Sequence, residues 1–505
     1  MCGIIINIGK DNENLTKEML NRIKHRGPDD THIVRPYSYI MIGFVRLAIN
    51  DNSLKGRQPF FWKNLIGVFN GEIYNYKEII NKYKFKLNSE SDSELLLPLY
   101  EKLGDDFYHS IDGMFTGVIF DYKKKEFIII KDLTSQKPLF LVRYYNGFSI
   151  VSELKSIIKD NVKEIINISS GLTKIDINGE ILYRKFYNLK LKADCIRGDN
   201  DFYVFLNSLV EDAVNKRIPN DKFGVFLSGG LDSSIIASIT KNSDKEVLYY
   251  SLISDTGSDL QHIEEVAKFL NIKKENLRLV KVPDFNDIKR IKKLVEMVVY
   301  HSESYNPSII SNGIGAFLLS EAAKKDGLKV ILSGEGADEL FCGYKSFYKN
   351  GFVENNWKKL RSEFIENLYF TELRRVDLCC MANSIEARSP FLDKKIIKLT
   401  NAFRIEDCFH KKLGKHSLRE SFKNQLPKKI VNRAKVSFDI GSGTRNILIN
   451  YLKMISNEIT FSEEDELKKI WDIFFLDVFK KHDKYEYFHS YPSFNHVIKK
   501  RKYNF

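Results

Sequence analysis

A glycine-rich segment between an apolar run and a helical pattern carries the strongest chemical signal in the chain. The apolar run is Gly224–Leu227, the segment is Ser228–Ser234 (SGGLDSS), and a helix is expected to start near Ile235. Glycine lets the backbone approach a ligand closely, and the free N–H groups at a helix N-terminus attract negative charge. The segment therefore predicts a phosphate-binding loop, although the sequence contains no Gly-x-x-x-x-Gly-Lys-Ser/Thr pattern.

A second glycine-rich turn, Ser333–Glu339, follows the apolar run Val330–Leu332. It contains Asp338, and the first loop contains Asp232. Mg²⁺ prefers oxygen ligands, so two carboxylates from separate loops are suited to hold this ion on the phosphates of a bound ligand.

The N-terminus offers a different kind of chemistry, because Cys2 follows the initiator residue Met1 directly. Removal of Met1 would leave Cys2 with a free α-amino group, whose pKa is ordinarily near ~8. That amine can take the proton of the thiol of its own residue, so one residue supplies both nucleophile and base. Cys2 is therefore a candidate nucleophile of the N-terminal nucleophile (Ntn) hydrolase type.

Groups suited to amide hydrolysis follow Cys2 along the chain. Arg46 offers a fixed cation for an α-carboxylate. Asn70 and Gly71 place a side-chain amide beside a glycine N–H, a pair suited to an oxyanion hole. Asp92 offers a carboxylate for an α-ammonium group. Together these groups predict a site that hydrolyses the side-chain amide of an amino acid.

In this order, the N-terminal motifs resemble the class II glutamine amidotransferase domain from Cys2 to about Lys155. The Ser228–Ser234 loop resembles the pyrophosphate loop of ATP pyrophosphatases. With the later motifs Glu386–Asp393 and Arg433–Phe438, nearly the whole chain resembles the glutamine-hydrolysing asparagine synthetase family.

The resemblance implies a reaction in two halves. Cys2 would attack the glutamine amide, with Asn70 and Gly71 stabilising the oxyanion, and the released ammonia would pass through an internal tunnel. Aspartate would attack the α-phosphate of ATP to give β-aspartyl-AMP and pyrophosphate, and ammonia would then displace AMP. Glu335 would assist amide formation, and Lys435 would neutralise charge on the α-phosphate. The implied glutamine-binding residues are Arg46, Leu47, Asn70, Gly71, Glu72 and Asp92. The implied ATP-binding residues are Leu227, Ser228, Gly229, Gly230, Asp232, Ser233, Ile253, Ser333 and Gly334, with Asp232 and Asp338 as Mg²⁺ ligands.

Two domains must position these groups. Short β-rich runs such as Phe127–Ile130 dominate before residues 190–201, and helical periodicity as in Asp259–Asn271 dominates after them. Strands that alternate with helices predict a parallel sheet, with its ligand at the carboxyl ends of the strands. We predict a glutaminase domain over 1–190, expected from the resemblance to be an αββα Ntn-hydrolase sandwich, and an α/β ATP-pyrophosphatase domain over 201–505.

Composition agrees with a globular enzyme of 505 residues, 43% of them hydrophobic. Six cysteines without a metal-ligand spacing indicate a reduced, cytoplasmic compartment, and no apolar stretch is long enough for a membrane span. The net charge of +13 is dispersed, so no nucleic-acid partner is expected, and Lys499–Lys502 is interpreted as a solvated tail. The expected partners are the small molecules glutamine, aspartate and ATP, with a homodimer left open.

The chain departs from the family pattern at three positions. Lys131 stands where an arginine is usual, and Ser135 stands where a glycine is usual. After His301–Pro307, the arginine expected within Thr-Ile-Arg-Ala-Ser is missing from Ile310-Ser311-Asn312. A small dicarboxylate needs a fixed cation for its α-carboxylate. Arg388 is the candidate substitute, and a structural ion pair is the equal alternative for this residue.

Two other functions stay open at this point. One is an amidotransferase that acts on another carboxylate, and the intact Cys2 favours ammonia transfer over ring closure within one substrate. The other is a catalytically silent binding protein of the same fold. The intact set of Cys2, Asp232, Glu335, Asp338 and Lys435 argues against silence.

Overall fold

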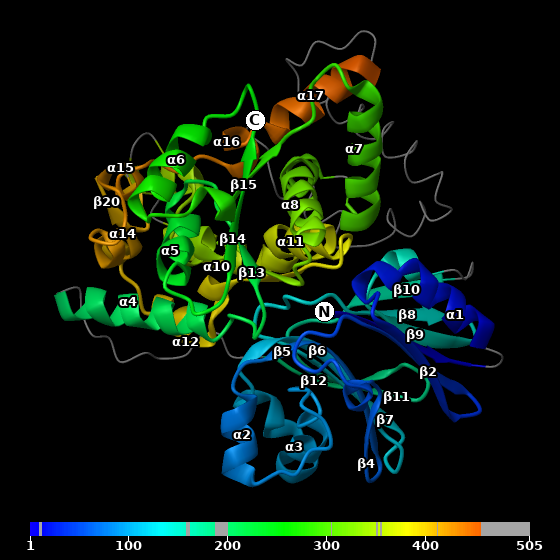
Figure 1. The fold of residues 1–505 in the computed structure, drawn as a ribbon. Helices are drawn as coiled ribbons and strands as arrows, with labels where there is room; N and C mark the ends of the chain where they lie inside the picture. The colour runs from blue at the N-terminus through cyan, green and yellow to red at the C-terminus, as the bar shows by residue number, and fades with distance from the viewer. Residues whose placement is uncertain are drawn as a thin grey trace. The chain divides into compact units, whose positions relative to one another are not determined.

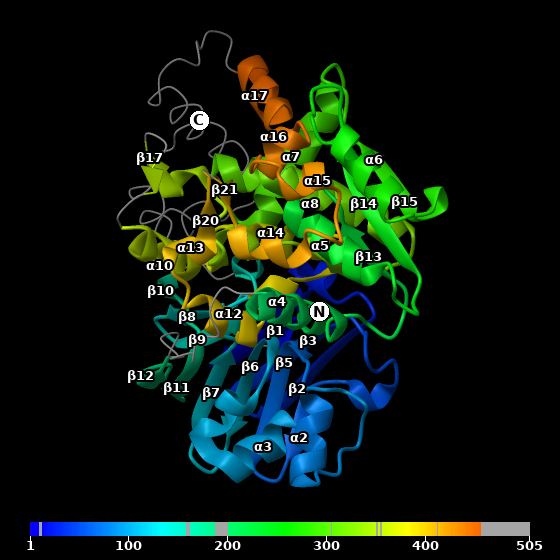
Figure 2. The same cartoon turned by 90° about the vertical axis from the view of Figure 1, so that its left-hand side faces the viewer.

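The computed structural model describes residues 1–9, 13–157, 162–186, 200–304, 306–349, 352–353, 356–411 and 413–455. The chain divides into two compact units, Met1–Leu189 and Lys190–Phe505 (Figures 1 and 2). Several features of the sequence lie outside the described residues: most of the segment 190–201, Cys195, Tyr305 and the tail Lys499–Lys502.

Unit 1 contains two six-stranded sheets whose strands pair antiparallel to their neighbours along each sheet. The first has the order β10-β8-β9-β1-β3-β2 and consists of β1 (Cys2–Ile8), β2 (Asp30–Tyr37), β3 (Ile40–Arg46), β8 (Phe140–Tyr144), β9 (Gly147–Val151) and β10 (Val162–Asn167). The second has the order β12-β11-β7-β6-β5-β4 and consists of β4 (Phe60–Trp62), β5 (Leu65–Ile73), β6 (Gly113–Asp121), β7 (Glu126–Lys131), β11 (Gly171–Asp176) and β12 (Ile181–Lys185).

The strand β7 shows why these residues form layers. Phe127 and Ile129 belong to the core between the two sheets, whereas Ile128 and Ile130 belong to a second core under α3 (Leu96–Leu103). Side chains alternate between the faces of a strand, so an uninterrupted apolar run fills a strand buried on both sides. With α1 (Glu13–Arg22) over the first sheet and α2 (Tyr76–Tyr83) and α3 on the second, unit 1 has the predicted αββα order (Figure 1).

Unit 2 is built on a five-stranded parallel sheet of order β15-β14-β13-β16-β19. Its strands are β13 (Phe223–Phe226), β14 (Val247–Ile253), β15 (Leu277–Lys281), β16 (Val330–Leu332) and β19 (Glu386–Arg388). The parallel sheet predicted from the alternation of strands and helices is confirmed, and both glycine-rich loops follow strands at its carboxyl edge.

Helices surround this sheet. They include α4 (Asn200–Asn215), α5 (Leu231–Thr240), α6 (Leu260–Phe269), α7 (Ile288–Ser302), α8 (Pro307–Lys325), α9 (Ala337–Leu340), α10 (Trp357–Asn367), α11 (Glu372–Met381), α12 (Lys394–Thr400), α13 (Ile405–Cys408), α14 (His416–Phe422), α15 (Lys428–Val431), α16 (Phe438–Gly441) and α17 (Thr444–Ile455). The helix expected to start near Ile235 begins earlier, at Leu231, with Gly230 as its N-cap. The predicted start was wrong because the turn ends at Gly230, which is the N-cap of the helix. Asp232 therefore already lies in the first helical turn.

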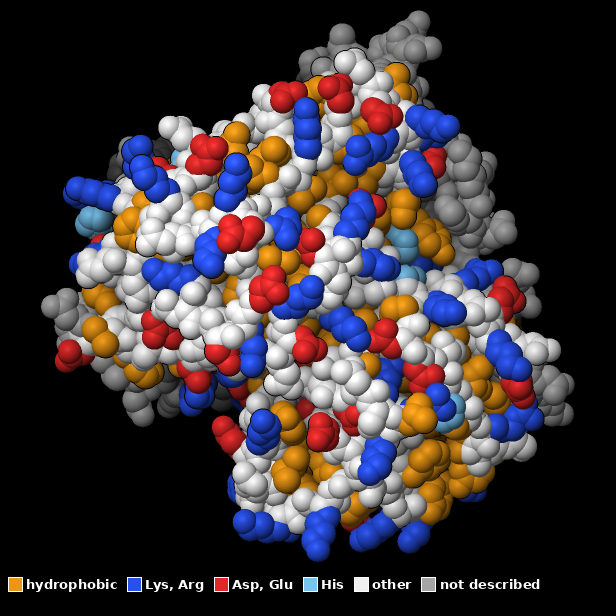
Figure 3. Space-filling model, viewed as in Figure 1, with side chains coloured by type: hydrophobic (Ala, Val, Ile, Leu, Met, Phe, Trp, Pro, Cys, Tyr) orange, Lys and Arg blue, Asp and Glu red, His pale blue; other side chains and the backbone are white. Residues whose placement is uncertain are grey.

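The face of the molecule in Figure 3 carries charges of both signs. On the face shown in Figure 3, Lys and Arg side chains are interspersed with Asp and Glu. Within the described ranges, no helix combines the length and the apolar character that a membrane crossing needs. Five cysteines fall within the same ranges, and all five are buried and free of disulfides.

Candidate functional site

Cys2 and Asn70 lie in contact in unit 1. The backbone N–H of Cys2 donates to Oδ1 of Asn70 at 2.8 Å, and Asn70 is fully buried. Nδ2 of Asn70 is buried and has no hydrogen-bond partner among the described residues. Next to it, Gly71 has φ +137°, and a Cβ there would lie 2.0 Å from the Met114 carbonyl oxygen. Only glycine fits this position on β5, directly after the buried amide of Asn70.

A buried charged cluster lies behind Cys2. Nε of Arg26 donates to the Cys2 carbonyl oxygen at 2.9 Å, and its Nη1 lies 2.6 Å from Oε1 of Glu153. His25 and Lys155 contact the other carboxylate oxygen of Glu153, at 2.9 and 2.6 Å. Burial would raise the pKa of Glu153, but Lys155, His25 and Arg26 hold it well below its ordinary value. Local sequence patterns do not indicate that these three basic residues converge on one carboxylate, because they come from segments that are distant along the chain.

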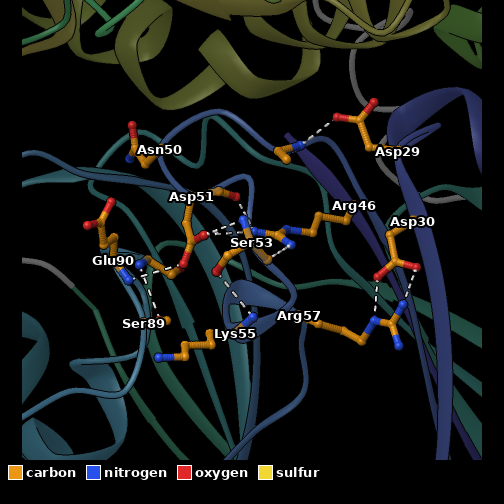
Figure 4. A network of polar contacts seen from close by, with 12 residues as sticks. Asp29, Asp30, Arg46, Asn50, Asp51, Ser53, Lys55, Arg57, Ser89 and Glu90 are labelled. Atoms are coloured by element: carbon orange, nitrogen blue, oxygen red, sulfur yellow. Dashed lines mark hydrogen bonds and ion pairs between the residues drawn. The ribbon is translucent and has the colours of Figure 1, made fainter.

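Arg46 ends β3 directly opposite Cys2 in the strand register. Its Nη1 donates to the Ser53 carbonyl oxygen at 2.7 Å, and its Nη2 donates to the Asp51 carbonyl oxygen (Figure 4). Asp51 in turn accepts from the N–H of Ser53 at 2.7 Å and from that of Glu90 at 3.1 Å. This loop therefore fixes the guanidinium before any ligand arrives.

Two carboxylates converge on Asn50. Its Nδ2 donates to Oε2 of Glu72 at 2.6 Å and lies 3.5 Å from Oδ1 of Asp92. The second oxygen of Asp92 accepts from the N–H of Ile73 at 2.6 Å. Leu47, the remaining residue implied for glutamine binding, donates its N–H to the Met1 carbonyl oxygen at 3.0 Å. Arg46 thus lies opposite Cys2, and Glu72 and Asp92 meet at Asn50, so unit 1 offers both the cation and the anions that the recognition of a zwitterion requires.

The departures of unit 1 from the family pattern surround a buried turn. Asp132 accepts hydrogen bonds from the N–H groups of Phe115, Thr134 and Gln136 at 2.9–3.1 Å. Ser135 within this turn has φ +57°, which is left-handed backbone. A serine adopts this conformation at a cost that glycine does not have. Lys131 is fully buried at the end of β7.

In unit 2 the predicted phosphate loop joins β13 to α5. The N–H of Ser228 donates to Oγ of Ser233 at 3.1 Å, and the two hydroxyls also lie 3.1 Å apart. Before the loop, the N–H of Leu227 donates to the Tyr250 carbonyl oxygen at 2.8 Å, and Gly229 inside it has φ +66°. The backbone thus turns sharply at the carboxyl end of a central strand, with the N-terminus of α5 directly behind it.

A chain of alternating charges connects this loop to the second one. Nζ of Lys415 lies 2.6 Å from Oδ2 of Asp232 and 2.6 Å from Oδ1 of Asp338. Nζ of Lys435 lies 2.6 Å from the other oxygen of Asp338. Lys415 is buried, with φ +62°, just before α14. Lys415 could not be predicted as part of the site, because no motif distinguishes it from the many other lysines near the C-terminus.

The opposite charges of these side chains stabilise one another. Burial would raise the pKa of Asp338, but Lys415 and Lys435 lower it to about 2. Burial would lower the pKa of Lys435, but Asp338, Asp232 and Glu335 raise it above its ordinary value. The four predicted residues Asp232, Asp338, Glu335 and Lys435 therefore lie within reach of one another's charge.

Glu335 faces an arginine that the sequence analysis did not name. Nη2 of Arg375 lies 2.8 and 2.9 Å from the two oxygens of Glu335. Burial raises the pKa of Glu335, and Arg375 opposes this rise. Nearby, Glu339 accepts a short hydrogen bond from the Tyr344 hydroxyl. Burial and then Glu372 and Asp338 raise the pKa of Glu339 to about 8.

The remaining predicted ATP-site residues line the same edge. The N–H of Ser333 donates to the Arg388 carbonyl oxygen at 2.9 Å, and a Cβ on Gly334 would lie 2.9 Å from Cβ of Asp232. Ile253 ends β14. Arg433 donates to the Gly229 carbonyl oxygen at 2.9 Å and contacts Asp259 at 2.5 Å. Arg433 therefore fastens the segment that carries Lys435 to the phosphate loop.

Asp232 and Asp338 fit a Mg²⁺ site in which a bound ligand completes the coordination shell of the ion. Oδ1 of Asp232 is buried and accepts no hydrogen bond from the described residues. No group of three or more His, Cys, Asp or Glu side chains suited to a metal occurs in the part of the chain that the structure describes. Mg²⁺ usually takes one or two protein carboxylates and completes its shell with phosphates and water. Asp232 and Asp338 match that pattern.

Comparisons with known proteins divide the chain in the same way. Residues 1–185 match a family model described as a glutamine amidotransferase domain, and residues 206–363 and 353–498 match one described as asparagine synthase. The chain is 32% identical over 474 residues to an asparagine synthetase [glutamine-hydrolyzing] 2 of Oryza sativa subsp. japonica, covering 88% of this chain and 78% of the relative. It is 31% identical over 476 residues to asparagine synthetase B of Escherichia coli (strain K12), covering 88% and 83%.

Proposed function

The chain belongs to the glutamine-hydrolysing asparagine synthetase family, and we propose that it converts L-aspartate to L-asparagine with nitrogen from glutamine. Members of this family use ATP, and the reaction releases AMP, pyrophosphate and glutamate. The observation that carries the proposal is that one chain contains both a Cys2–Asn70 contact at 2.8 Å and the Asp232–Lys415–Asp338–Lys435 charge chain.

In the glutaminase half, the nitrogen of Cys2 becomes an α-amino group when Met1 is removed. Oδ1 of Asn70 accepts from this nitrogen, which positions the amine to take the thiol proton. Nδ2 of the same side chain, together with the N–H of Gly71, stabilises the oxyanion formed by attack on the glutamine amide. Arg46 binds the α-carboxylate of glutamine, and Glu72 and Asp92 bind its α-ammonium group.

In the synthetase half, the loop Ser228–Ser233 and the N-terminus of α5 bind the phosphates of ATP. Lys435 stabilises negative charge that develops on the α-phosphate when the aspartate side-chain carboxylate attacks it. Lys415 neutralises Asp232 and Asp338 before substrates bind. Asp232 and Asp338 would hold Mg²⁺, which supplies further neutralisation of the phosphates. Glu335, whose pKa is raised by burial, accepts a proton as ammonia attacks the acyl-adenylate.

The test supplies ATP, Mg²⁺ and glutamine with or without aspartate, and measures asparagine, AMP and pyrophosphate. We expect asparagine and AMP in equal amounts, both dependent on aspartate. Release of ADP would contradict the assignment of the phosphate loop.

A second candidate is an amidotransferase for another carboxylate, which the serine at position 311 favours. Pyrophosphate release without aspartate, with no asparagine formed at saturating aspartate, would favour that candidate.

A further inference from the structure

Resting on the asparagine synthetase activity proposed above, we infer that Arg445 binds the α-carboxylate of the acceptor amino acid, in place of an arginine at position 311. From the sequence, Arg388 is a candidate substitute cation or a member of a structural ion pair. Arg388 is buried in β19, where its Nε donates to Oε1 of Glu386 at 2.7 Å and its Nη1 donates to the Arg217 carbonyl oxygen at 2.9 Å. These contacts give Arg388 a structural role at the edge of the sheet.

Arg445 is joined to position 311 through a buried carboxylate. Oγ of Ser311, on α8, donates to Oδ2 of Asp439 at 2.7 Å. Nε of Arg445, at the start of α17, donates to the same oxygen at 2.9 Å, and its Nη2 donates to Oδ1 at 3.2 Å. The structure therefore places an arginine from a different helix beside the residue that replaces the expected one.

Asp439 acts here as a fixed support for the arginine. It is fully buried, and Oγ of Ser437 donates to its Oδ1 at 2.5 Å, so each oxygen accepts two hydrogen bonds. Burial would raise the pKa of Asp439, but Arg445, Ser437 and Ser311 lower it, which keeps the carboxylate ionised. With its oxygens occupied, Asp439 is not suited to receive the ammonium group of an acceptor.

One edge of the Arg445 guanidinium stays open. A guanidinium has five N–H donors in a planar fork, and the Asp439 contacts use Nε and Nη2. Arg445 makes no other hydrogen bond or ion pair with the described residues, and its side chain is 27% exposed. By contrast, Arg375 engages Glu335, and Arg433 spans Asp259 and the Gly229 carbonyl oxygen. Arg445 thus combines a fixed orientation with donors free for a second carboxylate.

Arg445 also lies at the right edge of the sheet. It follows the segment that carries Lys435, and Ser254, just after β14, donates its hydroxyl to the Ser442 carbonyl oxygen at 2.8 Å. A Cβ on Gly443 would lie 2.2 Å from that hydroxyl oxygen. The N-terminal end of α17 is therefore held against the carboxyl end of the strand that follows the phosphate loop.

The experiment measures steady-state kinetics of Arg445→Ala with ammonium as nitrogen donor, so that glutaminase activity is not required. We expect the KM for aspartate to rise about 10- to 100-fold, as for a lost charge-assisted hydrogen-bonded contact, with the KM for ATP unchanged. The KM for aspartate of Arg445→Lys should lie between the values of the wild type and of Arg445→Ala. Arg290→Ala, which changes an exposed arginine on α7, is the matched control and should behave as wild type.

A second variant separates binding from folding. Adding Ser311→Arg to Arg445→Ala restores a cation near Asp439, and we expect it to recover part of the aspartate KM. An unchanged aspartate KM in Arg445→Ala, or a parallel rise in the KM for ATP, would overturn the inference while asparagine synthesis by the wild type still stands. Wild-type protein that forms no asparagine would instead overturn the proposed function and this inference together.

Discussion

The two candidate sites are held in place by different forces. In unit 1, Arg46 and Asp92 are fixed largely by backbone carbonyl and N–H groups of neighbouring loops and strands. In unit 2, Asp232 and Asp338 are held by Lys415 and Lys435, so charged side chains neutralise one another. A site for a small zwitterion can be rigid before binding, whereas a site for a polyanion must hold cations that would otherwise repel one another. The difference predicts that the two sites respond differently to substitution and to pH.

Cys2→Ala should separate the activities of the two sites most strongly. We expect this variant to lose glutamine-dependent asparagine synthesis completely, because it lacks the nucleophile, while ammonium still supports synthesis. Glutamate release and asparagine formation, measured in parallel with each nitrogen source, check this. Residual glutaminase activity in a homogeneous preparation would show that Cys2 is not the nucleophile.

Glu153→Gln tests the buried charged cluster behind Cys2 in unit 1. Removing this charge leaves Arg26 and Lys155 buried without their anion, so we expect unfolding of unit 1 to require about 3–5 kcal/mol less. Glu164→Gln removes a more exposed partner of Arg143 and should change stability by no more than about 1 kcal/mol. Denaturant titration of both variants makes the comparison. Equal losses of stability in the two variants would mean that the buried ion pairs stabilise unit 1 no more than the exposed pair does.

Lys435→Ala tests the charge chain of unit 2. We expect AMP formation to fall by at least ~10²-fold, through lost stabilisation of charge on the α-phosphate, while glutamine hydrolysis largely survives. Asp232→Ala should behave similarly. Assays of AMP and glutamate on the same preparations check both halves. A parallel loss of glutaminase activity would indicate a general folding defect instead.

Between pH 5 and 8, a dependence of stability on pH is expected from Glu339 in unit 2. Because the pKa of Glu339 is raised to about 8, the folded state binds a proton that the unfolded state has released above pH ~4.3. Raising the pH through this window should therefore lower the free energy of unfolding, by up to ~1.4 kcal/mol per pH unit from this group. Unfolding of Glu339→Gln measured from pH 5 to 8 should lose that component of the slope. An identical slope in both proteins would assign it to other groups.

The smallest effect concerns Ser135, which has φ +57°. Ser135→Gly should relieve backbone strain and stabilise unit 1 by at most about 1 kcal/mol, the net of lower strain and a more flexible unfolded chain. Thermal unfolding of the wild type and of Ser135→Gly, compared at the same pH, gives the sign. A destabilised Ser135→Gly variant would show that the serine side chain outweighs the strain.

The sequence by itself predicted the two-unit organisation and supplied most of the candidate residues of both sites. Apolar alternation and continuous runs such as Phe127–Ile130 predict strands, because side-chain period and burial are local properties. The motifs around Cys2, Asn70 and Asp232 are contiguous, so their residue types alone identify them. For the same reason the missing arginine at position 311 was visible without a structure.

Tertiary structure alone decided which distant charges meet. Lys415 approaches Asp232 at 2.6 Å, and Arg445 approaches Asp439 at 2.9 Å beside Ser311, although no local pattern distinguishes these residues from other lysines and arginines. The sequence offered Arg388 as the substitute cation, but folding buried that side chain against Glu386. Ion pairs depend on where loops at the edge of a sheet come together, and that information is spread over the whole fold instead of residing in any one segment.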